Sequence, residues 1–267
     1  MAQATPLVRK VFESRAFRPI ALIAFIIIGW ELTIQLFQIK PYLVPDPLVV
    51  IRQLITDWPK LWSETLVTTY ATVGGFLLSA LIGVPLAMLI AYSRLVESYV
   101  YPLLVFSQSI PKIAIAPLLV VWFGFGIVPK IVTAFLLGFF PVVVSTVMGF
   151  KSVDRDMIDL VRSMKASRLQ TFIKISLPFA MPSIFSGLKV SVTLAVVGAV
   201  VGEFVGANSG IGYVLQVANG NFDLPLMFAA LILLSLVGVV LFVLVDMVER
   251  VMIPWHASHR DDYYVSP

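Results

Sequence analysis

Six long apolar stretches divide this chain, and they constrain its fold more than any other feature. Each is close to the roughly 20 mostly apolar residues that a helix needs to cross a bilayer. Apolar residues make up 59% of the 267-residue sequence and charged residues 13%, well below the roughly 25% of soluble domains. The sequence therefore predicts an all-α, polytopic membrane protein with six transmembrane helices. The predicted spans are 19–39, 64–92, 99–124, 127–149, 183–205 and 225–247.

Lysine and arginine residues are distributed unequally between the two sides of the predicted bundle. With the N-terminus in the cytoplasm, thirteen of the nineteen fall in cytoplasmic segments, four fall outside, and Lys112 and Lys189 fall within spans. Positively charged loops tend to stay in the cytoplasm, so this bias predicts that both termini are cytoplasmic. The predicted parts are a tail (1–18), a transmembrane domain (19–247) and a second tail (248–267).

The third predicted span contains the first candidates for a solute pathway. Pro111 interrupts it, so we expect a kinked or broken helix. Lys112 follows the proline, and Gln108 lies one turn away on the same face. Glu203 lies near the outer end of the fifth span. Gln108, Lys112 and Glu203 are predicted to line the pathway; the alternative for Lys112 is a structural pairing with a carboxylate such as Glu203.

Other charged groups at membrane depth are interpreted as structural ion pairs or snorkelling side chains, because isolated charges there are costly. These groups are Glu31, Lys189 and Asp246. A small-residue face on the fifth span predicts close helix packing, within the subunit or between subunits. It consists of Gly198, Gly202 and Gly206.

A short amphipathic helix is predicted outside the membrane, within Pro45–Lys60. Asp46 can cap it, with Pro47 at the first helical position. Its apolar residues share one face: Leu48, Ile51, Leu54, Ile55 and Trp58. The helix either lies on the bilayer surface or contacts a soluble partner, and the two interpretations are compatible.

The cytoplasmic segment 150–182 predicts two short helices between spans four and five. Asp154 can cap the first, and its apolar residues follow helical spacing along one face. They are Met157, Leu160, Val161 and Met164. An apolar stripe in a water-facing loop needs a partner, which is either the subunit's own spans or a cytoplasmic protein that receives the helix in a groove.

The second short helix opens with a capping box, because Ser167 is followed three residues later by Gln170. Leu177-Pro178 is expected to end it, and the next span is expected to begin after Pro182.

This segment resembles the cytoplasmic signature of the permease subunits of bacterial binding-protein-dependent ABC importers. The signature is EAA, three residues, glycine, nine residues, isoleucine, one residue and Leu-Pro. Here Asp159-Leu160-Val161 stands at the EAA position, and Ile175 and Leu177-Pro178 match at the correct spacing. Lys165 replaces the glycine, which would suit a left-handed residue after the helix. A lysine in that conformation costs roughly 1 kcal/mol, so either the turn is built differently here or the strain is tolerated.

The resemblance extends over most of the chain. The sequence is most similar to the branch of these permeases that transports sulfonates, nitrate and taurine and that also handles pyrimidine precursors. The further matching segments are 43–47, 109–114, 122–126, 201–206 and 210–213. The resemblance implies a type I ABC-importer-like permease fold in the bacterial inner membrane and a homodimer of permeases. It also implies two cytoplasmic ATP-binding subunits, which would bind ATP and magnesium, and a periplasmic or lipid-anchored solute-binding protein.

In such a machine, ATP would close the ATPase dimer and drive alternating access for a small solute: a sulfonate, nitrate, taurine or a pyrimidine precursor, with anions among the candidates. The residues that would couple to the ATPase are Met157, Asp159, Leu160, Val161, Arg162, Met164, Lys165 and Ser167.

Several chemistries have no basis in this sequence. It has no cysteine, its two histidines lie in the C-terminal tail, and it contains no phosphate-binding P-loop. We therefore expect no metal site, no cofactor, no nucleic-acid partner and no enzymatic activity in this chain, so that energy arrives through a partner. The main alternative is a secondary transporter driven by an ion gradient, although no convincing internal repeat supports it.

Overall fold

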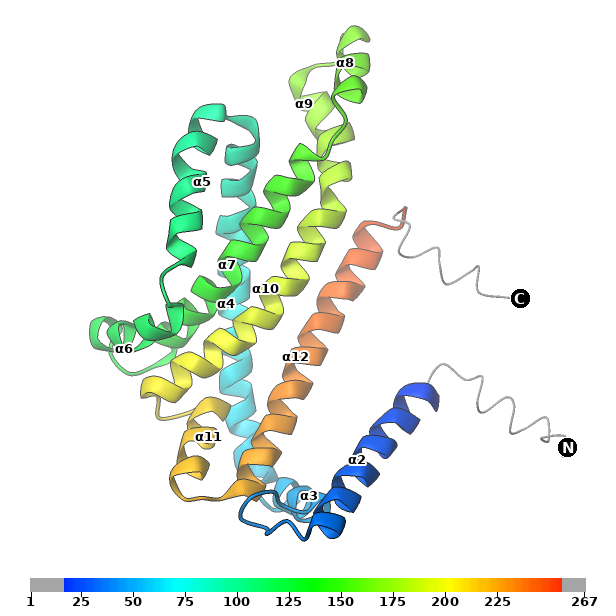
Figure 1. Ribbon diagram of the computed structural model, residues 1–267. Coiled ribbons are helices and arrows are strands. Elements are labelled where there is room, and N and C mark those ends of the chain that lie inside the picture. Colours follow the sequence, from blue (N-terminus) through cyan, green and yellow to red (C-terminus); the bar gives the residue numbers. More distant parts are fainter. Residues whose placement is uncertain (1–16, 256–267) are drawn as a thin grey trace, which may run out of the picture.

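The computed structural model describes residues 17–255, and every element of regular structure in this part of the chain is a helix (Figure 1). The predicted all-α fold class is confirmed. Most of the predicted tails, 1–18 and 248–267, lies outside the described residues. The elements are α2 (Phe17–Phe37), α3 (Pro47–Thr56), α4 (Trp58–Tyr92), α5 (Arg94–Gln108), α6 (Lys112–Phe123), α7 (Ile127–Lys151), α8 (Arg155–Ser163), α9 (Arg168–Thr171), the π-helical turn η1 (Phe172–Ser176), α10 (Leu177–Gly206), α11 (Ile211–Gly220) and α12 (Leu224–Met252).

Four helices among the described residues are long and apolar enough to cross a membrane. They are α4, α7, the continuous helix Arg168–Gly206, and α12. The pair α5 and α6 forms a fifth candidate span that is bent by 93°, and α2 contributes a shorter apolar stretch, Ala21–Phe37. The count of six spans stays a prediction.

Helices α4, α7 and α10 form the centre of the bundle, where small residues allow close approach. A Cβ atom on Gly75 of α4 would lie 2.4 Å from the Cβ of Ala134 on α7. On α10, a Cβ on Gly198 would lie 2.6 Å from the Cα of Ala134, and one on Gly202 would lie 2.9 Å from the Cα of Lys130. The predicted small-residue face of α10 therefore packs inside the subunit, which was one of its two interpretations.

The predicted span 99–124 is broken, as its prolines indicated. Helix α5 ends at Gln108, and α6 begins at Lys112 after Pro111, which has no N–H to continue the helix. Because of the 93° bend, Gln108 and Lys112 do not share one helical face, and that expectation was wrong.

The chain does not leave the helix at Leu177-Pro178, and this expectation was also wrong. Helix α9 continues through η1 into α10, so the helix runs from Arg168 to Gly206. In η1 the N–H of Leu177 donates to the carbonyl of Phe172, five residues earlier. This wider turn accommodates Pro178, which cannot donate and whose ring would crowd the preceding turn of an ordinary α-helix.

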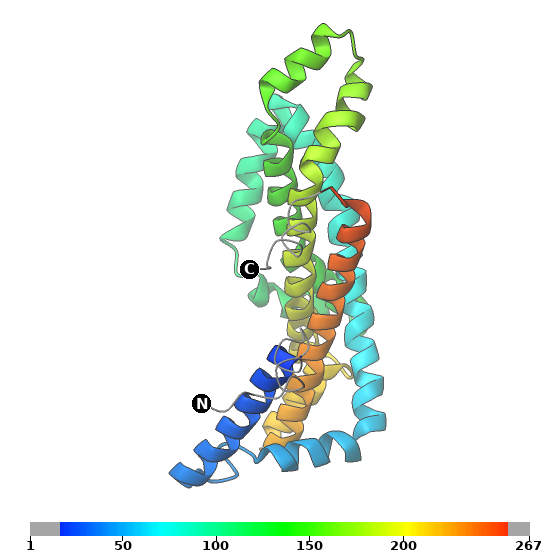
Figure 2. The same ribbon diagram turned by 90° about the vertical axis from the view of Figure 1, so that its right-hand side faces the viewer.

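The two ends of the bundle differ in shape. We call the end that carries α8 and α9 the α8 end; it extends beyond the ends of α5 and α12 (Figure 1). The opposite end, the α11 end, carries α3 and α11, and Figure 2 shows α3 lying across the bundle axis there. Asp46 and Pro47 begin α3 as predicted, although the Asp46 side chain makes no capping hydrogen bond. Leu48 and Ile55 on its predicted apolar face are exposed, while Val50 is buried.

Candidate functional site

Short-range capping interactions build the helical pair at the α8 end, as the sequence predicted. The Asp154 carboxylate accepts a hydrogen bond of 2.9 Å from the backbone N–H of Asp156 and so caps α8. The Ser167 hydroxyl accepts from the N–H of Gln170 at 3.2 Å, and the Gln170 side chain accepts from the N–H of Ser167 at 2.8 Å. Both halves of the capping box are therefore present, and they fix the start of α9.

Lys165 adopts the left-handed conformation that usually favours glycine, with a φ of 61°. Its N–H donates to the carbonyl of Arg162 at 2.9 Å, and the N–H of Ala166 donates to the carbonyl of Val161 at 3.3 Å. These two bonds form a Schellman motif, which satisfies carbonyls that the last turn of α8 would otherwise leave unpaired. The turn is thus built in the usual way, with lysine in the strained position.

The apolar face of α8 points into open space. Leu160 is 62% exposed and Met164 75% exposed, and Met157 is also exposed. Ile158 and Val161 are half-buried. A helix of nine residues that presents large apolar side chains to solvent has a surface suited to burial against a partner.

The polar residues predicted to flank this contact lie on or next to α8. A nitrogen of Arg162 lies 3.5 Å from a carboxylate oxygen of Asp159, and both side chains are mostly exposed. Such a pair contributes little to stability. Lys165 and Ser167 instead shape the turn between α8 and α9, so the structure brings all eight predicted coupling residues into one small region.

Glu203 lies in a buried polar cluster at the α11 end. Its side chain has no exposed area. Its carboxylate accepts hydrogen bonds from the Thr68 hydroxyl at 2.9 and 3.0 Å and from the N–H of Gly212 at 2.8 Å. The Nζ of Lys130 lies 3.8 Å away. Lys130 is therefore the partner of Glu203, and the expected alternative pairing with Lys112 was wrong. In this conformation Glu203 reaches no open surface of the subunit, and a pathway role stays a prediction.

The same cluster holds the loop between α10 and α11. Lys130, itself 2% exposed, donates to the carbonyl of Ser209 at 2.7 Å. Glu64 accepts from the N–H of Gly210 at 2.5 Å. At Gly210, where φ is 102°, an added Cβ would lie 2.1 Å from the Glu203 carboxylate, so only glycine fits.

Sequence reasoning missed most of this cluster, which we call the α11 clamp: Glu64, Thr68, Lys130, Glu203, Ser209, Gly210 and Gly212. Lys130 was one of the four basic residues counted outside the membrane, and the structure buries it in the first turn of α7. The one available signal was the spacing of Glu64 and Thr68, which places both on one face of α4.

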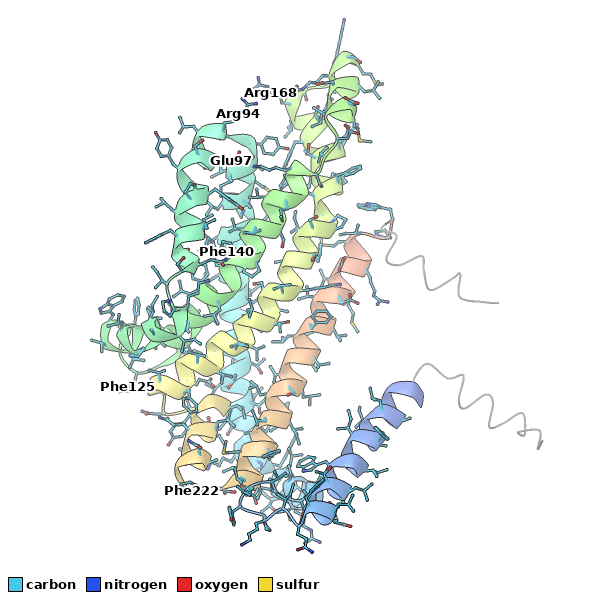
Figure 3. The ribbon with its side chains drawn as sticks, in the orientation of Figure 1. Arg94, Glu97, Phe125, Phe140, Arg168 and Phe222 are labelled. Carbon is cyan, nitrogen blue, oxygen red and sulfur yellow. The ribbon has the colours of Figure 1, made fainter. Side chains whose placement is uncertain are left out.

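The remaining predicted pathway residues lie at the break in the third span. Gln108 is exposed at the end of α5, and Lys112 is partly exposed at the start of α6. The Nζ of Lys112 lies 5.9 Å from the ring centre of Phe140 on α7, which Figure 3 labels. No carboxylate among the described residues forms an ion pair with Lys112.

Two of the three charges interpreted as structural are ion-paired. Lys189 of α10 lies 2.5 Å from carboxylate oxygens of both Asp246 and Glu249 on α12. Glu31 accepts a hydrogen bond of 2.6 Å from the side chain of Gln35, one turn along α2.

Comparison with known proteins gives consistent results. The family described as "Binding-protein-dependent transport system inner membrane component" matches residues 83–254. The formylaminopyrimidine transport permease protein ThiX of Halalkalibacterium halodurans is 38% identical, over 90% of this chain and 96% of its own length. The riboflavin transport system permease protein RibX of Chloroflexus aurantiacus is 34% identical, over 97% of this chain and 98% of its own. A Bacillus subtilis relative named for aliphatic sulfonates transport, SsuC, is 31% identical, over 89% of this chain and 87% of its own length.

A solved structure of the MetNI methionine ABC transporter in inward-facing conformations resembles this chain with a TM-score of 0.58. The match covers 73% of this chain and 95% of the solved chain, at 21% sequence identity. At this level of identity the resemblance shows the fold alone.

Proposed function

The chain belongs to the family of binding-protein-dependent inner membrane transport components, and from this premise we propose that two copies of it form the permease of an ATP-driven importer for a small nitrogen heterocycle. It has the type I ABC-importer permease fold and is the membrane-spanning component of a binding-protein-dependent ABC importer. The proposed homodimer would work with two copies of a cytoplasmic ATPase, which bind ATP and magnesium, and with one solute-binding protein.

The observation that carries the coupling role is the exposed apolar face of α8. Leu160 and Met164 keep most of their surface exposed in the subunit, and a groove on an ATPase would remove both from water. Because α8 is connected directly to α7 and, through the Schellman turn and η1, to α10, a movement of the ATPase would act on two central spans. This connection suits alternating access, in which the spans rock between two conformations.

Substituting the apolar face tests this contact. We expect L160D combined with M164D to lower the affinity for the ATPase by roughly a hundredfold or more, since two buried anchors would become charged. The matched control, L160M with M164L, keeps the face apolar and should retain the ATPase. The measurement is co-purification with the ATPase from membranes in which both variants insert equally. Equal retention of the ATPase by both double variants would remove α8 as the main contact.

We propose that the α8 end is cytoplasmic and that both termini lie on that side. Basic residues support this orientation, since the α8 end carries Arg94, Lys151, Arg155, Arg162, Lys165, Arg168, Lys174 and Arg250, against Lys40, Arg52, Lys60 and Lys130 at the α11 end. The α11 end, with α3 and α11, would then receive the solute-binding protein. Reporter fusions after residue 40 and after residue 260 should show opposite sidedness.

The relatives support a nitrogen heterocycle, of the pyrimidine-precursor class, over a sulfonate as the solute. ThiX and RibX are named for formylaminopyrimidine and riboflavin and are 38% and 34% identical, whereas the relative named for sulfonates is 31% identical. Calorimetric titration of the cognate binding protein with a formylaminopyrimidine, riboflavin and an aliphatic sulfonate would decide the class. Tight binding of a sulfonate alone would overturn this assignment.

Gln108 and Lys112 are proposed to line the solute pathway, because the break between α5 and α6 leaves both side chains at least partly exposed near the middle of the chain's third span. K112M should insert, dock the ATPase and melt normally but lose most ATP-dependent uptake into vesicles, while K112R should keep it. Normal uptake by K112M would exclude the pathway role. Uptake that needs a proton gradient at constant ATP would instead favour a secondary transporter.

A further inference from the structure

A cavity of about 290 Å³ lies behind α8, between the end of α4 and helix α9. Its lining includes Tyr92, Ile158, Arg162, Arg168 and Phe172. Successive residues of an α-helix are about 100° apart, so Ile158 and Arg162 lie on the side of α8 opposite Leu160. An ATPase docked on the exposed apolar face would therefore leave this cavity open.

The cavity has a positive lining without a compensating negative one. Arg162 and Arg168 both line it, and none of its lining residues is acidic. Asp159 lies 3.5 Å from Arg162, but both are mostly exposed to solvent, which screens the pair. Two guanidinium groups around one small cavity match a phosphate group. Each planar guanidinium can donate two parallel hydrogen bonds to a pair of phosphate oxygens.

The position of the cavity along the bundle indicates where the phosphate comes from. Tyr92 is the last residue of the spanning helix α4, and tyrosines at span ends lie at the level of lipid headgroups. Arg94, at the start of α5, and Arg168 lie at this same end in Figure 3. The π-helical turn η1 supplies Phe172 and Ser176 to the lining, and such turns occur frequently at functional sites.

We propose that this cavity binds the phosphate group of an anionic phospholipid, held between Arg162 and Arg168. Basic pockets between helices on the cytoplasmic side of membrane proteins take lipid headgroups of this kind. A bound headgroup bridges α8 and α9 to the end of α4 and so fixes the orientation of α8. Lipid binding itself does not depend on the proposed transport function; only its consequence for ATPase coupling does.

Native mass spectrometry of the purified full chain, titrated with phosphatidylglycerol or phosphatidylcholine, tests the site. We expect one phosphatidylglycerol to bind in preference to phosphatidylcholine, and R168Q to weaken that binding about tenfold, which corresponds to about 1.4 kcal/mol. K174Q is the matched control, because Lys174 is an exposed cation in η1 that does not line the cavity. It should weaken binding less than about twofold.

R168K distinguishes a lost binding site from a misfolded protein, because lysine keeps the positive charge and removes only the planar guanidinium group. It should bind with intermediate affinity and melt like the wild type. Equal binding of the two lipids, or equal losses in R168Q and K174Q, would overturn the proposal. Displacement of phosphatidylglycerol by inorganic phosphate would keep the phosphate site but reject the lipid as its source.

Discussion

The two ends of this subunit differ in which side chains they bury and which they expose. At the α11 end, charged and polar groups are buried, and Glu203, Lys130 and Thr68 satisfy one another and the start of α11. At the α8 end, apolar side chains such as Leu160 and Met164 lie in solvent. Buried polar groups are tolerated only when paired, whereas exposed apolar groups gain stability only from a partner. The α11 clamp is therefore complete within one subunit, and the apolar face of α8 is not.

This difference predicts where substitutions act. Changes in the α11 clamp should lower the stability of the isolated subunit, because its interactions exist without any partner. Changes on the exposed face of α8 should leave that stability nearly unchanged and act on assembly.

The largest expected effect is that of K130M. Removing the lysine leaves the buried carboxylate of Glu203 without its cation, and breaking a buried pair in this way costs about 3–5 kcal/mol. Reversible unfolding of the purified chain in mixed micelles measures the loss. The double variant K130M/E203Q removes the stranded charge and should recover part of it. A loss below about 1 kcal/mol in K130M would mean that the α11 end is not held by this pair.

A smaller effect is expected for K189M, which strands Asp246 and Glu249 on α12. The lysine is 21% exposed and Asp246 22% exposed, so solvent relieves part of the penalty. We expect a loss of about 1.5–3 kcal/mol in the same unfolding measurement. The control R250Q removes a mostly exposed partner of Asp246 within α12 and should cost about 0.3–0.5 kcal/mol. Equal losses in the two variants would contradict an interhelical role for Lys189.

The sequence was sufficient for features that depend on near neighbours. The caps at Asp154 and Ser167 and the break at Pro111 each follow from a few consecutive residues. Signals of this kind involve hydrogen bonds over two to five residues, so the sequence order already places the partners together. The sequence left open how Lys165 replaces the glycine, and the structure shows it in the left-handed conformation.

Features that depend on distant contacts were not predictable in the same way. Thr68 and Glu203 are 135 residues apart, and only the packing of α4 against α10 brings them together. The position of Pro178 inside a continuous helix was missed for a related reason. A proline normally argues for a helix end, and the widened turn η1 that accommodates it has no simple signature in sequence.

S167A should lower the stability of α9 by about 1 kcal/mol, because the substitution removes the acceptor for the N–H of Gln170 in the capping box. This loss is local, so hydrogen exchange of the α9 amides is the suitable measurement. S163A is the control, because its hydroxyl bonds only to the carbonyl of Leu160 within α8. If S167A and S163A change the hydrogen-exchange protection of the α9 amides equally, the capping box does not position the turn.

The smallest effect, of opposite sign, is expected for K165G. A left-handed lysine is strained by roughly 1 kcal/mol, whereas glycine adopts this conformation freely but loses more chain entropy on folding. The net result should be a gain of about 0.5 kcal/mol in the free energy of local unfolding at the end of α8. Hydrogen exchange would show it as slower exchange of the last amides of α8. The exposed apolar face is unchanged in this variant, so ATPase affinity should rise only slightly or stay constant. A marked fall in affinity would show that the Lys165 side chain itself contacts the ATPase, and it would extend the partner surface of the α8 end beyond its apolar residues.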